Sequence, residues 1–338
     1  MKEASALGVV VIGRNEGDRL KACLASLATR QVAIVYVDSG SCDGSVAHAA
    51  AVGASVVELD RARPFSAARA RNAGFHKLCS THPSLRFVQF VDGDCLVDAG
   101  WLPAALRALT SQPDVAVVCG RRRERFPEQS LWNRLCDIEW DMPVGEAEAC
   151  GGDCLVRRDA FEAVGGFDEE MIAGEEPELC LRLRQRGWRI LRLADEMTLH
   201  DAAMTRFGAW WRRAIRAGHA YAETTLKHGF ASGRYGIRPL LSACFWALAL
   251  PALALALAPW TRGLTLLLLL AGYGLLAWRV RRWYRTYGSS RDVDALALLL
   301  VLTKAAHLEG ARRFAVACLL GRSRQLIEYK SSGEARTG

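Results

Sequence analysis

The chain has 338 residues, enough for one large α/β domain and a smaller appended part. Its formal net charge of +8 at pH 7 suits a partner that is either nucleic acid or an anionic membrane surface. The arginines gather beside apolar segments toward the C-terminal end, which favours the membrane and argues against nucleic acid. The 11 cysteines are odd in number and lie mostly in apolar segments, which indicates reduced thiols in a cytosolic domain and excludes a disulfide framework.

The first third of the chain alternates between short apolar runs and amphipathic stretches. The runs are rich in Val and Ile, and they predict strands over residues 7–12, 32–37, 54–59, 85–91 and 115–120. The amphipathic stretch 16–30 carries its apolar side chains on one helical face, namely Leu20, Cys23, Leu24 and Leu27. This alternation predicts an α/β fold with a mainly parallel, Rossmann-like sheet flanked by helices. The opening residues show no signal-peptide pattern, so we expect this domain to be cytosolic.

Ligands of such sheets bind beyond the carboxyl ends of the strands, where this sequence places polar clusters. The first is FVDGDC at 90–95. Residues two apart in a strand point to the same side, so the carboxylates of Asp92 and Asp94 are expected together, with Gly93 leaving the backbone open to a ligand. Such a pair binds a hard divalent cation, Mg²⁺ or Mn²⁺, which typically completes its shell with substrate phosphates. An ordinary polar turn is the alternative.

A second polar cluster follows the strand predicted over 32–37, in VYVDSGSCDGS at 35–45. Its serines and glycines predict a turn into a helix whose N-terminus can receive an anion. In the alternative interpretation, Asp38 is only a turn residue before a capped helix. The phosphate-binding loops of other nucleotide-binding proteins are missing, because GVVVIGRN at 8–15 lacks the Lys-Ser/Thr of a Walker loop and no G-x-G-x-x-G follows a strand.

The third cluster is acidic and precedes a helix predicted over 177–186, with Pro177 at its start and Gly187 after its end. Glu175 and Glu176 then lie at the positive N-terminus of the helix. They either stabilise the helix dipole, by about 0.3–1 kcal/mol, or form a pair of unequal carboxylates in which burial keeps one as a general base.

Two other signals are weak when taken alone. His200, in MTLHDAAM, is on its own more often a structural or surface residue than a ligand. Cys150 and Cys154 are four apart, but no second pair with zinc-like spacing follows, so packing is favoured over a metal site.

From about residue 239 the composition becomes apolar. Residues 239–259 are uncharged and long enough to cross a bilayer core, and Pro251 is tolerable in a membrane helix. Residues 263–278 form a shorter second span, so a membrane hairpin is predicted. Positive charge marks the cytosolic side, and it flanks both ends of the hairpin at Arg234, Arg238, Arg279, Arg281, Arg282 and Arg285. The alternative is a buried helical hairpin of a soluble domain.

Two further stretches predict contact with the membrane surface. The apolar pieces of 293–322 are short and interrupted by charge, which favours an interfacial helix over another pair of spans. The sequence WWRRAIRAGHAY at 210–221 predicts an aromatic, arginine-rich helix resting on the membrane.

Taken together and in order, these clusters resemble glycosyltransferase family 2, the inverting enzymes with a GT-A fold, and in particular its membrane-anchored bacterial-type members. The resemblance covers roughly residues 7–205. It is carried by VVIGRNEGDRLKACLASL, VYVDSGSCDGS, ARARNAG, FVDGDC, GGDCLVRRDAFEAVGGFDE and GEEPELCLRLRQRGWRI.

The resemblance implies roles for particular residues. Contacts with the nucleotide sugar are implied for Glu16, Asp38, Arg71, Asp92 and Gly152. Ligands of a Mg²⁺ or Mn²⁺ ion are implied for Asp94, Asp92 and His200. Glu176 matches the second acid of the family's Glu-Asp pair, the usual catalytic base. Because it is a glutamate here, Glu175 stays open as the alternative base.

The implied function is metal-dependent, inverting transfer of a sugar from a nucleoside-diphosphate sugar to a membrane-associated acceptor, lipid-linked or saccharide, in surface glycan or glycolipid synthesis. The missing Gln-x-x-Arg-Trp motif favours transfer of single sugars. The expected parts are a catalytic domain over 1–232, a transmembrane hairpin over 233–286, and interfacial helices with a cytosolic tail over 287–338. They would lie in a bacterial inner membrane, with the catalytic domain on the cytoplasmic side. A nucleotidyltransferase and a catalytically idle membrane scaffold remain alternatives.

Overall fold

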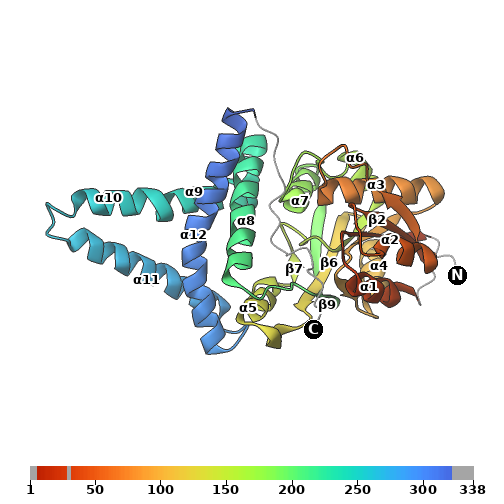
Figure 1. Cartoon of the computed structure of the whole chain (residues 1–338), viewed down its shortest axis with the longest axis horizontal. Helices are drawn as coiled ribbons and strands as arrows, with labels where there is room; N and C mark the ends of the chain where they lie inside the picture. The colour runs from red at the N-terminus through yellow and green to blue at the C-terminus, as the bar shows by residue number, and fades with distance from the viewer. Residues whose placement is uncertain (1–5, 29–31, 322–338) are drawn as a thin grey trace. The chain divides into compact units, whose positions relative to one another are not determined.

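The computed structural model describes residues 6–28 and 32–321, which group into two compact units (Figure 1). Described residues within Met1–Phe126 and Trp140–Ala203 form a unit built on a β-sheet, called the sheet unit below. Those within Pro127–Glu139 and Met204–Lys330 form a helical unit. The three functional domains expected from the sequence divide the chain at other residues and remain a prediction. Most of the expected tail, 322–338, lies outside the described residues.

Within the described residues, the sheet unit holds a nine-stranded sheet in the order β3-β2-β1-β4-β8-β6-β9-β5, with β7 paired to β9. One half is parallel and consists of β3 (Ser55–Glu58), β2 (Ala33–Asp38), β1 (Leu7–Gly13) and β4 (Phe87–Asp92). The other half is mixed and consists of β8 (Cys154–Arg157), β6 (Val115–Glu124), β9 (Arg189–His200), β5 (Cys95–Val97) and β7 (Gly145–Glu146). The five strands predicted from the apolar runs are confirmed.

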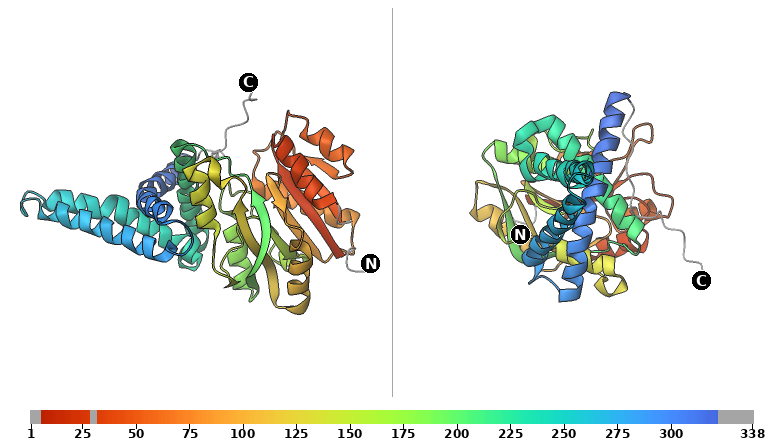
Figure 2. Two further views of the ribbon diagram at one scale, coloured as in Figure 1. Left: turned by 90° about the horizontal axis from the view of Figure 1, so that it is seen from below. Right: turned by 90° about the vertical axis from the view of Figure 1, so that its left-hand side faces the viewer.

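Helices flank this sheet, so its central strands are buried on both faces (Figure 2). Val9, Val10 and Val11 are all fully buried, which is why β1 shows a continuous apolar run and no alternation. The flanking helices are α1 (Asp18–Ala28), α2 (Ser45–Ala51), α3 (Ala67–Thr81), α4 (Trp101–Ser111), α6 (Arg158–Ala163) and α7 (Glu175–Gln185). The predicted apolar face of α1 is the one that is buried.

The parallel half of the sheet brings three strand ends to one edge, and two of them are aspartates. In the register of β1, Gly13 pairs with Asp38 of β2, and Ile12 pairs with Asp92 of β4. Segments that are far apart in the sequence therefore end side by side, as parallel strands require. This edge is where the candidate site is built.

The helical unit contains the apolar C-terminal segments. Its helices are α5 (Leu131–Trp140, whose last residue belongs to the sheet unit), α8 (Phe207–His228), α9 (Ile237–Cys244), α10 (Leu250–Leu257), α11 (Leu264–Tyr284) and α12 (Ser290–Leu319). Short 3₁₀ turns, η2 (Pro127–Gln129) and η3 (Gly229–Tyr235), complete it. Figure 2 shows α9 and α10 running beside α11 as a hairpin, and α8 lying beside α12.

The hairpin has the dimensions and composition of two membrane spans. Ile237–Leu257 and Leu264–Tyr284 are each 21 residues long and strongly apolar. Their most apolar windows are only 11% and 0% buried, so the described protein does not cover them. Leu267, Leu268 and Leu270 are each more than 60% exposed. A core hairpin of a soluble domain would be mostly buried, so this alternative does not match the described residues.

Pro251 changes the hydrogen bonding of the first hairpin helix. Residues Phe245–Ala249 (η4) form a π-helical turn, in which the N–H of Leu250 bonds to the carbonyl of Phe245. The next residue, Pro251, has no N–H to offer the carbonyl of Trp246. The hydroxyl of Tyr273 on α11 donates to that carbonyl at 2.7 Å. The proline therefore creates an unpaired acceptor that joins the two arms of the hairpin.

Helices α8 and α12 approach so closely that their backbones touch at two glycines. A Cβ on Gly218 of α8 would lie 2.1 Å from the carbonyl oxygen of His307, and a Cβ on Gly310 of α12 would lie 2.0 Å from that of Ile215. Neither position has room for a side chain. The crossing thus depends on two small residues rather than on an apolar interface alone.

We expect Gly310→Ala to destabilise the packing of α12 on α8 by about 1–3 kcal/mol, because the added methyl group must displace backbone atoms. Thermal unfolding of the detergent-solubilised protein measures the change. Gly274→Ala is the matched control, since a Cβ at this helical glycine meets no atom within 4 Å. Equal melting temperatures for both variants would contradict the close crossing.

Candidate active site

The two aspartates of FVDGDC do not lie on one strand. Asp92 is the last residue of β4, whereas Asp94 lies in the turn before β5. The prediction that both side chains point from one strand was therefore wrong. The turn brings the carboxylate of Asp94 to the same edge of the sheet. A Cβ on Gly93 would lie 3.0 Å from the carbonyl oxygen of Ile12, whose distance to the Gly93 nitrogen is 2.8 Å. Gly93 thus permits close packing against the end of β1, a role different from the ligand access expected for it.

Arg71 connects Asp92 with the acidic start of α7. Its Nη2 lies 2.8 Å from Asp92 Oδ1, and its Nη1 lies 2.8 Å from Glu175 Oε1. The guanidinium is buried, and although burial alone lowers the pKa of Arg71, the carboxylates of Asp92 and Glu175 raise it overall. The residue therefore keeps its charge and ties together α3, the end of β4 and the N-terminus of α7. This places two predicted site residues, Arg71 and Glu175, beside Asp92.

Asp153 is a fully buried carboxylate at the centre of the site. Its Oδ1 accepts from the backbone N–H of Asp92 at 2.9 Å, and its Oδ2 accepts from the hydroxyl of Thr198 at 2.9 Å and the thiol of Cys95 at 3.2 Å. Arg122 Nη2 lies 2.8 Å from the same Oδ2 and supplies the balancing charge. A buried carboxylate with this many partners fixes the ends of several strands relative to one another.

His200 brings the end of β9 to the aspartates. Its Nε2 lies 3.3 Å from Asp94 Oδ2, and ligand atoms of Asp94, Cys95 and His200 all lie within 4.8 Å of one another. Burial, with Arg122 nearby, lowers the pKa of His200 to about 4, so the ring is neutral at pH 7. Its Nδ1 is buried without a hydrogen-bond partner among the described residues. A neutral imidazole beside a carboxylate is a donor set suited to a divalent metal.

The charges of this cluster also fit a divalent cation. Among the described residues, Arg71 pairs with Asp92 and Glu175, Arg122 pairs with Asp153, and Asp94 lies 3.3 Å from the neutral ring of His200. Carboxylates gathered at one edge of a sheet disfavour one another's ionisation, and a nearby cation relieves this. Oxygen donors from Asp92 and Asp94, with one imidazole, suit Mg²⁺ or Mn²⁺.

Glu176 lies in a separate pocket of buried thiols. Its Oε1 accepts from the backbone N–H of Cys150 and from the thiol of Cys180 at 3.2 Å, and the two sulfurs are 3.8 Å apart. Within the described residues, Oε2 of Glu176 makes no hydrogen bond. It is also not one of the fully buried polar atoms that lack a partner. Burial, followed by the effect of Cys150, raises the pKa of Glu176 well above its usual range. Residues 175 and 176 are therefore unequal, as expected from the sequence.

Gly152 lies directly against the charged cluster. Its φ of +101° is one that residues with a side chain rarely adopt, and a Cβ there would lie 3.3 Å from Arg122 and 3.5 Å from Arg71. The loop that carries Cys150 and Asp153 can pass this close to both arginines only with glycine. Gly152 thus lies beside Arg71 and Arg122, and its contact with the nucleotide sugar stays a prediction.

Glu16 and Asp38 end at the same edge of the sheet. The side chain of Glu16 lies near Gly93, and its Oε2 is 2.8 Å from Arg19 Nη2. Asp38 accepts from the hydroxyl of Tyr36 and from the backbone N–H groups of Gly40 and Ser41, at 2.7–2.9 Å. Asp38 therefore holds its turn, as the structural alternative supposed, and its nucleotide contact stays a prediction.

Three contributors were missed in the sequence. Asp153 lies in ACGGDC, whose glycines and cysteines are the more conspicuous residues. Arg122 lies in a run of three arginines, and the sequence does not distinguish it from the other two. Cys180 follows Glu176 by four residues, so the two side chains lie on one face of α7, where Glu176 also contacts Cys150. That i, i+4 spacing was the available signal.

Comparison with known proteins identifies the class of this fold and site. The sheet unit has a mixed α/β fold of the GT-A type. Residues 8–165, just under half of the chain, match the family described as Glycosyl transferase family 2, which supports a family 2 glycosyltransferase. The pre-mycofactocin glycosyltransferase of Mycobacterium tuberculosis is 28% identical over 232 residues, which are 65% of this chain and 47% of that protein. The chain thus spans about half the length of this relative.

Other relatives cover more of their own length. The glycosyltransferase AglE of Haloferax volcanii is 22% identical over 255 residues, 72% of this chain and 80% of that protein. Among solved structures, the mannosyltransferase PcManGT of Pyrobaculum calidifontis, in complex with GDP-Man and Mn²⁺, superposes with a TM-score of 0.57 at 21% identity, covering 88% of this chain and 87% of that one. Residues 1–349 of TarS from S. aureus give 0.50 at 15% identity, covering 94% and 92%. These likenesses confirm the fold.

We expect the purified chain to bind Mn²⁺ and Asp94→Ala to weaken that binding at least about tenfold, because the carboxylate is a direct oxygen donor. Electron paramagnetic resonance of free Mn²⁺ in a titration measures the affinity. Asp114→Ala is the control. Asp114 is exposed and directly precedes the first residue of β6, Val115, away from the candidate site. Unchanged Mn²⁺ affinity in Asp94→Ala would remove Asp94 from the site.

Proposed function

We propose that the chain transfers a sugar, with inversion, from a nucleoside-diphosphate sugar to a membrane-associated acceptor in surface glycan or glycolipid synthesis. One observation carries this proposal: the carboxylate of Asp94 lies beside the neutral ring of His200 at the carboxyl edge of the sheet, where Asp92 ends the neighbouring strand. The match of residues 8–165 to Glycosyl transferase family 2 supports the same proposal. The donor would lie over Glu16, Asp38, Arg71 and Gly152.

Asp94 and His200, with Asp92, would hold a Mg²⁺ or Mn²⁺ ion beside the diphosphate. When bound, the ion supplies positive charge that stabilises the departing nucleoside diphosphate. Arg71 cannot replace it, since both ends of its guanidinium already hold carboxylates. The solved PcManGT complex, which contains GDP-Man and Mn²⁺, supports this use of a divalent ion.

Glu176 is the proposed general base. A base must accept a proton from the acceptor hydroxyl at the pH of the cell, which favours a carboxylate whose pKa is raised, as burial does here. The Cys150 amide and the Cys180 thiol fix Oε1, so Oε2 is the oxygen that can receive the proton. Glu175, in contrast, is ion-paired with Arg71, and its proposed role is to position that guanidinium.

Inversion follows from this arrangement. The deprotonated hydroxyl attacks the anomeric carbon from the face opposite the diphosphate, and a single displacement inverts the configuration. An acceptor that is already an ionised lipid phosphate would need Glu176 less as a base. The acceptor is therefore part of the test of this residue.

The membrane placement is also proposed, and the exposed hairpin supports it. Two apolar helices that the described protein leaves uncovered would be unfavourable in water. With arginines flanking both ends of the hairpin, the rest of the chain would lie on the cytoplasmic side of an inner membrane. Helix α12, continuous over 30 residues and carrying Lys304, Glu309 and Arg312, would lie in the headgroup region.

Membranes that carry the chain should release a nucleoside diphosphate from one member of a panel of labelled sugar nucleotides and should transfer the label to extractable lipid. Chromatography of the nucleotide products and counting of the lipid extract measure both. Release of pyrophosphate instead would identify a nucleotidyltransferase. Metal-dependent nucleotide binding without turnover of any donor would favour the idle scaffold.

Glu176→Gln should lower kcat by at least about 10²-fold with a hydroxyl acceptor, because general-base catalysis contributes typically 10²–10⁴-fold. The amide keeps the shape of the side chain and can still accept from Cys150 and Cys180. Glu175→Gln should mainly raise the KM for the donor, since it loosens Arg71. The reverse pattern, with kcat lost only in Glu175→Gln, would exchange the two roles.

A further inference from the structure

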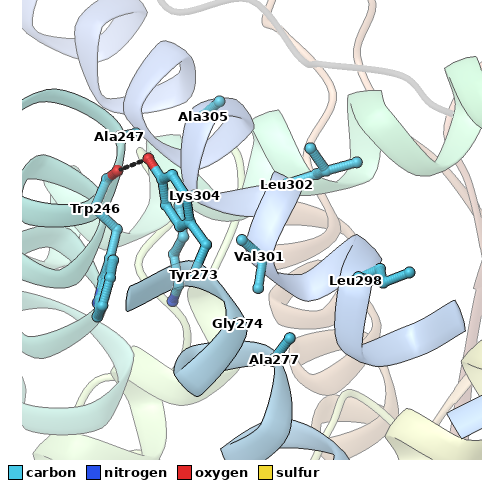
Figure 3. A pocket seen from close by; sticks show the side chains of 10 residues that line it. All are labelled: Trp246, Ala247, Tyr273, Gly274, Ala277, Leu298, Val301, Leu302, Lys304 and Ala305. Carbon is cyan, nitrogen blue, oxygen red and sulfur yellow. Dashed lines mark hydrogen bonds between the residues drawn. The ribbon is translucent and has the colours of Figure 1, made fainter. Parts of the chain in front are cut away.

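A cavity of about 490 Å³ lies in the helical unit, remote in sequence from the residues of the candidate active site. Trp246 and Ala247 of η4 line it together with three residues of α11, and α12 supplies the other wall. Figure 3 shows Trp246, Tyr273 and Lys304 gathered on one side and Leu298, Val301 and Leu302 on the other. The cavity therefore has one wall on each arm of the apolar hairpin and one on the amphipathic helix.

Lys304 is the one charged residue among the ten that line this cavity. Within the described part of the chain it has no hydrogen-bond or ion-pair partner. The side chain is half-buried, and this partial burial lowers the pKa of its amine. A partly desolvated ammonium group without a partner among the described residues favours the binding of an anion.

The aromatic wall of the cavity is fixed in place. The hydroxyl of Tyr273 donates to the Trp246 carbonyl that Pro251 leaves without a donor, and the two rings are 5.8 Å apart. Tyr and Trp with a lysine are the side chains that proteins place at the level of lipid headgroups. The opposite wall is apolar, and Leu298 and Leu302 remain more than half exposed.

We propose that this cavity binds an anionic lipid through its phosphate, which the amine of Lys304 pairs, while the acyl or prenyl chain lies along the exposed leucines of α12 and the hairpin. The inference rests on the proposed membrane placement. It adds a binding site that is separate from the metal cluster. The ligand is a lipid rather than free phosphate because nine of the ten lining residues carry no charge and most are apolar, so they would gain from burial against a chain.

The test is lipid binding by the full chain in detergent, followed by native mass spectrometry with phosphatidylglycerol and phosphatidylcholine. The wild-type chain should bind phosphatidylglycerol at least about tenfold more tightly, as expected for a charge-assisted hydrogen bond. Lys304→Met should abolish that preference, and Lys304→Arg should retain it. Lys227→Met is the matched control, since Lys227 is an exposed lysine on α8 of the same unit.

Retention of the preference in Lys304→Met, or an equal loss in Lys227→Met, would overturn the proposal. A second variant, Gly274→Phe, fills the cavity without touching the charge, because a Cβ at Gly274 meets no atom within 4 Å. It should fold with an unchanged melting temperature and lose lipid binding. Full binding by folded Gly274→Phe would show that the cavity is not the site.

Competition distinguishes the sources of the phosphate. Displacement of phosphatidylglycerol by a polyprenyl phosphate would support the proposal and make the site one for a lipid acceptor, whereas displacement only by other phospholipids would support it with a bulk membrane lipid. Displacement by inorganic phosphate at the same concentration would overturn it. The assay contains no sugar nucleotide, so intact Lys304-dependent binding in a chain that turns over no donor would contradict the proposed function alone.

Discussion

The site depends first on the guanidinium of Arg71, which is buried and held between two carboxylates from distant parts of the sequence. Asp92 comes from the end of β4 and Glu175 from the N-terminus of α7. Removing either partner of a buried ion pair leaves the other charge without compensation, which destabilises the fold. This mutual requirement holds α7 against the edge of the sheet. The neighbouring Glu176 is thereby placed in its pocket of thiols.

Asp153 is a second buried charge, and it connects β4, β5, β6 and β9 as Arg71 connects α3, β4 and α7. It accepts hydrogen bonds from Asp92, Thr198 and Cys95 and is balanced by Arg122. Both networks share Asp92, so the position of that carboxylate is set from two sides. Such preorganisation matters for a reaction in which charge develops on a diphosphate, because groups that are already oriented do not have to reorganise as the charge appears.

In the helical unit, the main constraint is that polar backbone atoms of an apolar hairpin need hydrogen-bond partners. Pro251 removes one donor, and the hydroxyl of Tyr273 on the other arm replaces it. Where α8 and α12 cross, Gly218 and Gly310 let two backbones touch. Among the described residues, the amine of Lys304 has no hydrogen-bond or ion-pair partner, and it lines a cavity between these elements. The proposed lipid phosphate would supply that partner.

Sequence by itself determined several elements: the five apolar runs became strands, and the predicted face of α1 was the buried one. The two apolar helices, Ile237–Leu257 and Leu264–Tyr284, overlap the predicted 239–259 and 263–278. It also singled out residues that the structure brings to one edge of the sheet, namely Asp92, Asp94, Arg71, Glu175, Gly152 and His200. Their roles remain predictions, because local patterns and a family resemblance report only on residue type and spacing. Only the tertiary structure decided that Asp94 lies in a turn, that Glu176 and Glu175 face different partners, and that Asp153, Arg122 and Cys180 belong with them. Pairing of buried charges joins residues as far apart as Arg71 and Glu175, 104 positions along the chain, and no periodicity in the sequence indicates which carboxylate a given arginine will meet.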